Sequence, residues 1–230
     1  MNLVDTGIEG LNDMLGGGIP EGSSILVLGS YGAGKTTMGI HFAYRGAVKE
    51  ESVAYFTLEE RKESIVAASR SYGLDFTPFL EKRIFLMNPD VLEFVEMLKN
   101  GENFRANLEA MKPKRVVIDS ISLLLLVAEG EATKRNILMN LSNALRDLGV
   151  TSLLLAESNI SFPYSSREGL AEFVSDGVIS LLNRYDDVLG TTTNIIRVLK
   201  MRLVNHDRKA RPYSIGPRGI TVLSKSDLFQ

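Results

Sequence analysis

Eight consecutive residues combine glycines with a lysine and a threonine, a composition suited to binding phosphate. They are Gly29, Ser30, Tyr31, Gly32, Ala33, Gly34, Lys35 and Thr36. An apolar run, Ile25–Leu28, precedes them and a helical pattern, Thr37–Arg45, follows, which is the context that a phosphate-binding loop needs. Backbone N–H groups and a helix N-terminus can then converge on the phosphates, with Thr37 adjoining them. Lys35 would reach the β- and γ-phosphates and the Thr36 hydroxyl would bind Mg²⁺.

A carboxylate follows a second apolar run later in the chain. The segment 115–120 reads Arg-Val-Val-Ile-Asp-Ser, so Asp119 stands where a buried strand would end. In a phosphate-loop fold this edge of the sheet faces the nucleotide. Asp119 would therefore bind Mg²⁺, directly or through its water molecules, and complete the site that Thr36 begins. The alternative is that Asp119 only caps a following helix.

Two further carboxylates follow the strand-like run Val53–Thr57. A glutamate at the end of a strand beside the γ-phosphate can polarise the attacking water, which a hydrolytic site requires. We predict that Glu59 is this base and that Glu60 assists it. Glutamates at the start of a helix also stabilise the positive end of its dipole, and Glu60 in particular could have only that role.

Composition restricts the class of protein. A hydrophobic content of 44% over 230 residues is enough to form one large core. The net charge of −2 argues against a protein that binds nucleic acid or another polyanion over its whole surface. There is no cysteine for disulfides or thiolate metal sites, and two histidines are too few for a zinc cluster. The first ten residues do not resemble a signal peptide, and the longest apolar run, Leu123–Ala128, is too short for a membrane helix. We expect one domain over residues 1–230, cytoplasmic and without membrane insertion.

Short strand-like runs alternate with helical patterns, which is typical of a mainly parallel sheet with helices on both faces. The predicted strands of this part are Ile25–Leu28, Val53–Thr57, Arg83–Met87, Val116–Ile118, Ser152–Ala156 and Gly177–Leu182. The helical patterns include Glu60–Ser71, Val91–Asn100 and Thr133–Leu148. The last strand-like runs, Thr192–Met201, Pro212–Ile215 and Ile220–Leu223, have no helix between them. They predict an antiparallel C-terminal extension of the sheet.

The order of these motifs resembles the ATPase domain of KaiC-type proteins in the RecA superfamily. Similar segments begin at Thr6–Asn12 and Leu15–Gly22, before the phosphate loop, and continue to Phe173–Ile179. The resemblance implies an α/β fold of the RecA-like P-loop NTPase type, with ATP and Mg²⁺ as ligands. It places Glu59 and Glu60 at the paired catalytic glutamates of that family. It also places Ser71, at the end of the next predicted helix, near the nucleotide.

A further segment resembles the part of such domains that reaches from one subunit into the ATP site of its neighbour. It consists of Leu199, Lys200, Met201 and Arg202, followed by His206. On a strand, Lys200 and Arg202 project to one face, where two cations could meet the charge that develops on the γ-phosphate. Neither cation has an evident role within its own chain. The resemblance implies that Lys200, Met201, Arg202 and His206 contact nucleotide, with Lys200 and Arg202 catalytic alongside Lys35. The alternative is a solvated basic edge strand.

Three functions are compatible with these features. The first is slow, Mg²⁺-dependent ATP hydrolysis at the interfaces of a homo-oligomer, such as a hexameric ring, with a regulatory or signalling role and an unidentified protein partner. The second is an ATP-gated scaffold or switch that hardly hydrolyses. The third is a recombination or repair paralogue with ATP-dependent DNA binding. Its DNA would contact the loops Ser120–Thr133 and Glu157–Ser175, which carry few positive charges.

Overall fold

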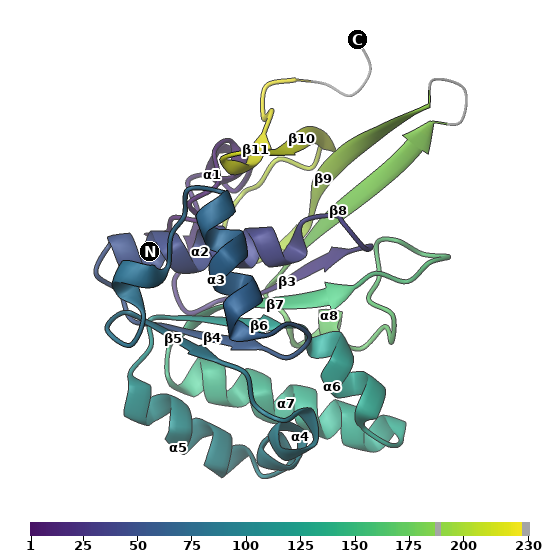
Figure 1. Ribbon diagram of the computed structural model, residues 1–230. Helices are drawn as coiled ribbons and strands as arrows, with labels where there is room; N and C mark the ends of the chain where they lie inside the picture. The colour runs from purple at the N-terminus through teal and green to yellow at the C-terminus, as the bar shows by residue number, and fades with distance from the viewer. Residues whose placement is uncertain (187–189, 227–230) are drawn as a thin grey trace.

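A nine-stranded sheet runs through the computed structural model, which describes residues 1–186 and 190–226 (Figure 1). Its strand order is β11-β10-β9-β8-β3-β7-β6-β4-β5. The strands are β3 (Ser24–Gly29), β4 (Val53–Thr57), β5 (Ile84–Met87), β6 (Arg115–Asp119), β7 (Thr151–Glu157), β8 (Gly177–Asp186), β9 (Thr191–Met201), β10 (Arg211–Gly216) and β11 (Gly219–Val222). Pairing is parallel from β8 to β5 and antiparallel from β8 to β11. The predicted mainly parallel sheet with an antiparallel extension is confirmed.

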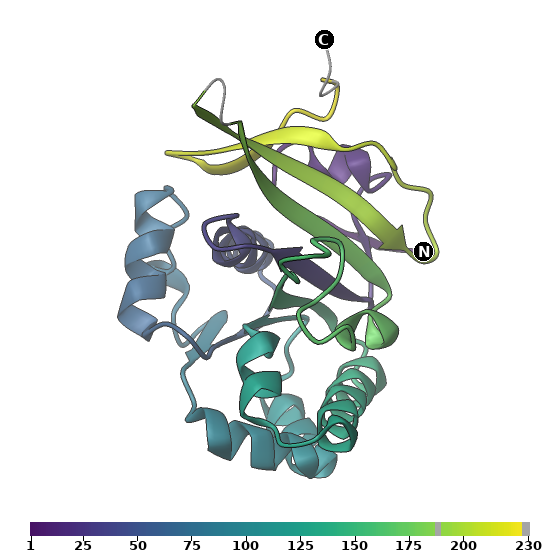
Figure 2. The ribbon, with the colours of Figure 1, turned by 90° about the vertical axis from the view of Figure 1, so that its right-hand side faces the viewer.

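Helices cover both faces of the sheet, because successive residues of each strand point apolar side chains to opposite sides. One face carries α2 (Lys35–Val48) and α3 (Lys62–Ser71). The other carries α4 (Val91–Lys99), α5 (Gly101–Met111), α6 (Ile121–Val127), α7 (Glu131–Asp147) and α8 (Ala171–Val174). The turned view in Figure 2 shows these two layers, with the β8–β9 ribbon twisting away from the teal helices. No helix in residues 1–186 and 190–226 has both the length and the apolarity needed to cross a bilayer.

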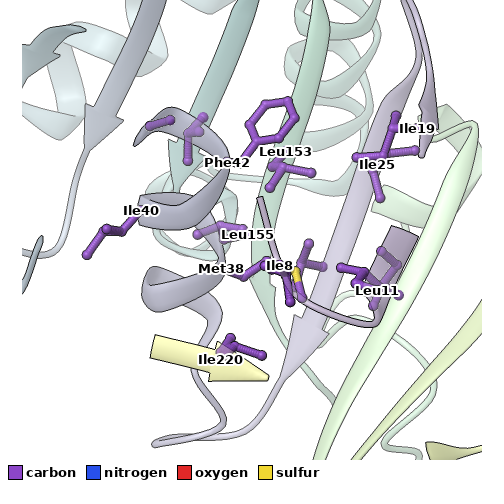
Figure 3. Packing of buried hydrophobic residues seen from close by; sticks show 14 of the residues in the cluster. Ile8, Leu11, Ile19, Ile25, Met38, Ile40, Phe42, Leu153, Leu155 and Ile220 are labelled. Atoms are coloured by element: carbon purple, nitrogen blue, oxygen red, sulfur yellow. The ribbon is translucent and has the colours of Figure 1, made fainter. Parts of the chain in front are cut away.

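The core beneath α2 also takes in the beginning of the chain. Figure 3 shows Ile8 and Leu11 beside Met38 of α2 and Leu155 of β7. This first segment contains β1 (Leu3–Val4), α1 (Leu11–Met14) and β2 (Ile19–Pro20), and β1 pairs with β2. Ile220 of β11 approaches α2 from the other end of the sequence (Figure 3). Both ends of the described chain therefore pack against the helix that follows the phosphate loop.

Among the helices that differ from the sequence-based expectation, α6 and α5 are the longest. Helix α6 lies within the segment Ser120–Thr133, which was expected to be a loop, and buries Ile121, Leu124 and Leu125. A continuous apolar run of this kind has no helical period to reveal it. Helix α5 buries only Phe104 and Leu108 along its length, which is too weak a pattern to predict a helix.

His41, in the middle of α2, is hydrogen-bonded to backbone groups from near both ends of the chain. The backbone N–H of Ile220 donates to Nε2 at 2.9 Å, and Nδ1 lies 3.0 Å from the carbonyl oxygen of Gly7. Because Nε2 accepts, the proton must be on Nδ1, which then donates to the carbonyl, and the ring is neutral. Burial lowers the pKa of His41, although the hydrogen bond to Gly7 acts in the opposite direction.

We expect acid to weaken this attachment. In the unfolded chain, His41 becomes protonated near its ordinary pKa of about 6.5, whereas in the folded protein its pKa is lower. The stability that neutral His41 contributes is therefore fully present above about pH 6.5 and is lost progressively below it. The contribution of His41 to the free energy of unfolding, taken as the difference between wild type and His41→Gln, should fall by up to about 1.4 kcal/mol for each pH unit below about 6.5. Urea titrations across this range measure it. His41→Gln should flatten the dependence and His206→Gln should retain it; equal slopes in both variants would contradict the assignment.

Candidate functional site

The predicted phosphate loop forms the connection between β3 and α2. Gly34 has a φ of 88°, and a Cβ there would meet Ile215 Cδ1 at 2.8 Å, so this position excludes a side chain. Lys35 begins α2, and its Nζ donates to the carbonyl oxygens of Gly29 at 3.0 Å and Ser30 at 3.1 Å. The ammonium group is therefore folded back over its own loop. Phosphate oxygens could take the place of these carbonyls as its partners.

Neighbouring strands support the loop from outside. The Tyr213 hydroxyl of β10 donates to the carbonyl oxygen of Ala33 at 2.6 Å. Nδ2 of Asn183, in β8, donates to the carbonyl oxygen of Tyr31 at 3.3 Å. The Tyr31 side chain itself is 79% exposed at the tip of the loop. The backbone of the loop is thus fixed by β8 and β10, while the Tyr31 side chain faces solvent.

Asp119 ends β6, between the ends of β4 and β7. Its carboxylate is buried and accepts a hydrogen bond from the Tyr55 hydroxyl, with 3.0 Å between the oxygen and Oδ2. Burial raises the pKa of Asp119 to about 6; hydrogen bonds from Thr36 and Tyr55 oppose this rise, and the charges of Glu59 and Glu60 add to it. The structure thus brings together Thr36 and Asp119, the two residues predicted to bind metal.

Glu59 and Glu60 are exposed at the same edge of the sheet. The Thr57 hydroxyl donates to the carbonyl oxygen of Glu60 at 2.8 Å, and Nδ2 of Asn88 donates to the carbonyl oxygen of Thr57 at 2.7 Å. These bonds fix the turn that carries both glutamates. The Ser120 hydroxyl donates to Oε1 of Glu59. The Glu59 carboxylate is therefore tied to the residue that follows Asp119, whereas Glu60 is held through its backbone.

The sequence reasoning missed Glu157, which ends β7 opposite Gly29. Burial lowers the pKa of Lys35, and Glu157 has the largest opposing effect, ahead of Asp119 and Glu59. Glu157 also forms a 3.5 Å ion pair with Arg167, in the segment that leads to α8. In the sequence, Glu157 is marked only as a polar residue that follows the apolar run of β7. Glu157 comes close to Lys35 only because the strand order places β7 next to β3.

The end of α3 lies against the start of α2. The Thr37 hydroxyl donates to the Tyr72 hydroxyl across 3.5 Å. The preceding residue, Ser71, donates from Oγ to the carbonyl oxygen of Ala68 at 2.8 Å. Thr37 and Ser71, two of the predicted nucleotide contacts, are therefore on neighbouring helix ends, and Tyr72 is a third polar group there that the sequence reasoning did not single out.

Lys200 and Arg202 have partners within their own chain, contrary to expectation. Nζ of Lys200 donates to the carbonyl oxygens of Ser175 at 2.6 Å and Glu172 at 3.2 Å. Arg202 forms a 3.2 Å ion pair with Asp176. Burial lowers the pKa of Lys200, and the charge of Arg202 lowers it further. Both cations are thus held at the end of α8 and the start of β8.

These two cations lie away from their own phosphate loop. The backbone N–H of Arg202 donates to the carbonyl oxygen of Asp176. The backbone N–H of Asp176 in turn donates to the carbonyl oxygen of Ser24, the first residue of β3. The loop begins at Gly29, the last residue of that strand, roughly 17 Å further along. Met201 is buried and His206 half-buried in the same region. The structure therefore does not bring this segment together with the phosphate loop of the same chain.

Comparisons with known proteins agree with this geometry. The family model described as "ATPase: KaiC" matches residues 4–227. The circadian clock oscillator protein KaiC of Prochlorococcus marinus is 29% identical over 228 residues, which are 95% of this chain and 45% of that protein. A UPF0273 protein of Pyrococcus horikoshii is 29% identical, with 95% and 93% covered. The crystal structure of a KaiC-like protein of Pyrococcus horikoshii has a TM-score of 0.83 at 33% identity, with 96% and 98% covered.

This chain spans about half the length of the curated clock proteins that it matches, and nearly the full length of the two archaeal relatives. The agreement extends through the phosphate loop, the strand-end carboxylates and the antiparallel strands, because the matched residues include all of them. The resemblance inferred from the sequence is confirmed, and so is the α/β fold of the RecA-like P-loop type.

We expect the buried charge of Asp119 to destabilise the protein when metal and nucleotide are absent. Its pKa is raised from 3.8 to about 6, so stability that is present below about pH 4 is lost as the pH rises through about 6. Asp119→Asn removes the charge and should raise the free energy of unfolding near pH 8 by about 1–3 kcal/mol. Urea denaturation in a chelator measures this gain, which should vanish near pH 4. An equal gain in Asp147→Asn, an exposed position, would contradict the explanation.

Proposed function

Because this chain belongs to the KaiC family of ATPases, we propose that it hydrolyses Mg²⁺-ATP slowly at the interface between identical subunits. Residues 1–230 would act as one ATPase domain of a homo-oligomer with a regulatory or signalling role. One observation carries the proposal: Lys35, Thr36, Asp119 and Glu59 converge at the carboxyl edge of β3, β4 and β6.

The phosphate and metal groups of the site have separate tasks. The backbone N–H groups at the start of α2 and the Lys35 ammonium group bind the phosphates. The Thr36 hydroxyl and Asp119 would hold Mg²⁺, which when bound neutralises charge that develops on the phosphates. Among residues 1–186 and 190–226 no group of three acidic or histidine side chains could hold a metal. Phosphate oxygens and water molecules would supply the other ligands of the ion.

Glu59 is the proposed base. It is exposed at the edge of the sheet, so water can approach it, and the Ser120 hydroxyl orients its carboxylate. A carboxylate in this position accepts a proton as the water attacks the γ-phosphate. Glu60 lies beside Glu59 in the same turn, and its assisting role stays a prediction.

Lys200 and Arg202 would serve the site of a neighbouring copy. Arg202 is roughly 17 Å from the phosphate loop of its own chain along β3, which is too far for its side chain to reach. Its ion pair with Asp176, and the carbonyl partners of Lys200, hold the segment in a defined position. A second copy whose carboxyl edge faces this segment would bring the cations to its γ-phosphate, with Met201 and His206 beside them.

The first experiment is phosphate release from Mg²⁺-ATP over a series of protein concentrations. Activity per subunit should rise with concentration, because the complete site needs two copies. Glu59→Gln should lower activity by about 10²-fold or more, since it removes the base. Arg202→Ala should lower it by about 10³-fold, since it removes a cation from the γ-phosphate. Arg105→Ala, an exposed arginine of α5, is the matched control and should leave activity unchanged.

Mixing the two inactive variants before adding ATP tests the interface itself. A mixed assembly contains interfaces with intact Glu59 from one copy and intact Arg202 from the other, so activity should return to roughly a quarter of the wild-type value. No recovery would exclude action in trans. Tight ATP binding without turnover by the wild type would favour the ATP-gated switch instead. Salt-sensitive binding of single-stranded DNA would favour the recombination alternative.

A further inference from the structure

A tyrosine hydroxyl is buried beside the carboxylate that would bind Mg²⁺. Tyr55 lies in the middle of β4 with no exposed surface, and its ring packs against Phe76 with 6.3 Å between centroids. Its hydroxyl donates to Oδ2 of Asp119 at 3.0 Å. A phenylalanine would fill the same apolar space, so packing alone does not account for the hydroxyl. The hydroxyl instead gives one oxygen of Asp119 a fixed partner.

Helix α2 makes room for this hydroxyl with a glycine. A Cβ at Gly39 would lie 3.0 Å from the Tyr55 hydroxyl oxygen and 3.0 Å from Val117 Cγ1. Glycine inside a helix is less favourable than alanine. Its presence here is explained by the close passage of α2 over the hydroxyl. Tyr55, Gly39 and Asp119 therefore form one arrangement, built from β4, α2 and β6.

We propose that Tyr55 is a positioning residue for Mg²⁺, holding Oδ2 of Asp119 so that the carboxylate keeps one orientation toward Thr36 and the metal. This inference rests on the proposed function. A carboxylate with one anchored oxygen cannot rotate away from the ion without breaking a buried hydrogen bond, which is costly where no water can replace it. Removing such a partner of a metal ligand typically weakens metal binding by about 10- to 100-fold.

The test compares the Mg²⁺ requirement of nucleotide binding in wild type and Tyr55→Phe. This substitution deletes one oxygen atom and keeps the ring. Binding of a fluorescent ATP analogue at fixed concentration is titrated with Mg²⁺, and binding in a chelator is measured separately. The Mg²⁺ concentration for half-maximal binding should rise about tenfold in Tyr55→Phe. Binding in the chelator should not change, because the phosphate loop is intact. A purely structural role would leave the Mg²⁺ requirement where it is.

Two further variants complete the design. Gly39→Ala presses a methyl group against the hydroxyl and should raise the Mg²⁺ requirement in the same direction. Tyr44→Phe removes a hydroxyl elsewhere on α2, where the ring packs against Phe79, and should match wild type. An unchanged requirement in Tyr55→Phe, or an equal rise in Tyr44→Phe, would overturn the inference. If Tyr55→Phe does not fold, a wild-type requirement in Gly39→Ala overturns it. Nucleotide binding by wild type that is absent or indifferent to Mg²⁺ would instead overturn the proposed function.

Discussion

The burial of one carboxylate, that of Asp119, is the constraint on which the rest of the site depends. Strand β6 lies between β4 and β7, so its last residue is enclosed on both sides and water cannot solvate the charge. Hydrogen bonds from Thr36 and Tyr55 offset part of the cost of burying the charged carboxylate, and the negative charges of Glu59 and Glu60 increase that cost. A divalent cation would remove this excess of negative charge. Binding of metal and nucleotide would therefore stabilise the folded protein.

The same constraint explains why α2 is anchored so firmly. The helix must begin where Lys35 and Thr36 can meet the carboxylates, and small displacements would separate them. The Tyr213 hydroxyl fixes the loop just before the helix, and His41 binds backbone groups from both ends of the chain two turns later. Strands β10 and β11 are thus part of the support of the site, although neither supplies a predicted catalytic group.

Local patterns in the sequence are sufficient to predict the functional groups that directly follow a single strand. The phosphate loop and strand β4 could be predicted because their apolar runs and polar endings are contiguous in the chain. Glu157 could not, because its closeness to Lys35 depends on β7 lying next to β3. The contacts of Lys200 could not be predicted either, since they are made to backbone carbonyls in and just after α8, a four-residue helix with no periodic pattern.

The two ends of the parallel strands differ in their charges, and this difference favours a directional assembly. The carboxyl edge gathers Asp119, Glu59 and Glu157 around Lys35, whereas Lys200 and Arg202 lie at the amino end, where Asp176 pairs with Arg202. Strand β3 separates these groups in one copy, so in the proposed mechanism they would meet only across a contact between two copies. A contact between the amino end of one copy and the carboxyl edge of the next uses two different surfaces. It repeats around a ring or along a filament and does not close in a two-fold dimer. The separation of these groups along β3 is therefore an argument for the proposed head-to-tail assembly, and the mixing of Glu59 and Arg202 variants is its direct test.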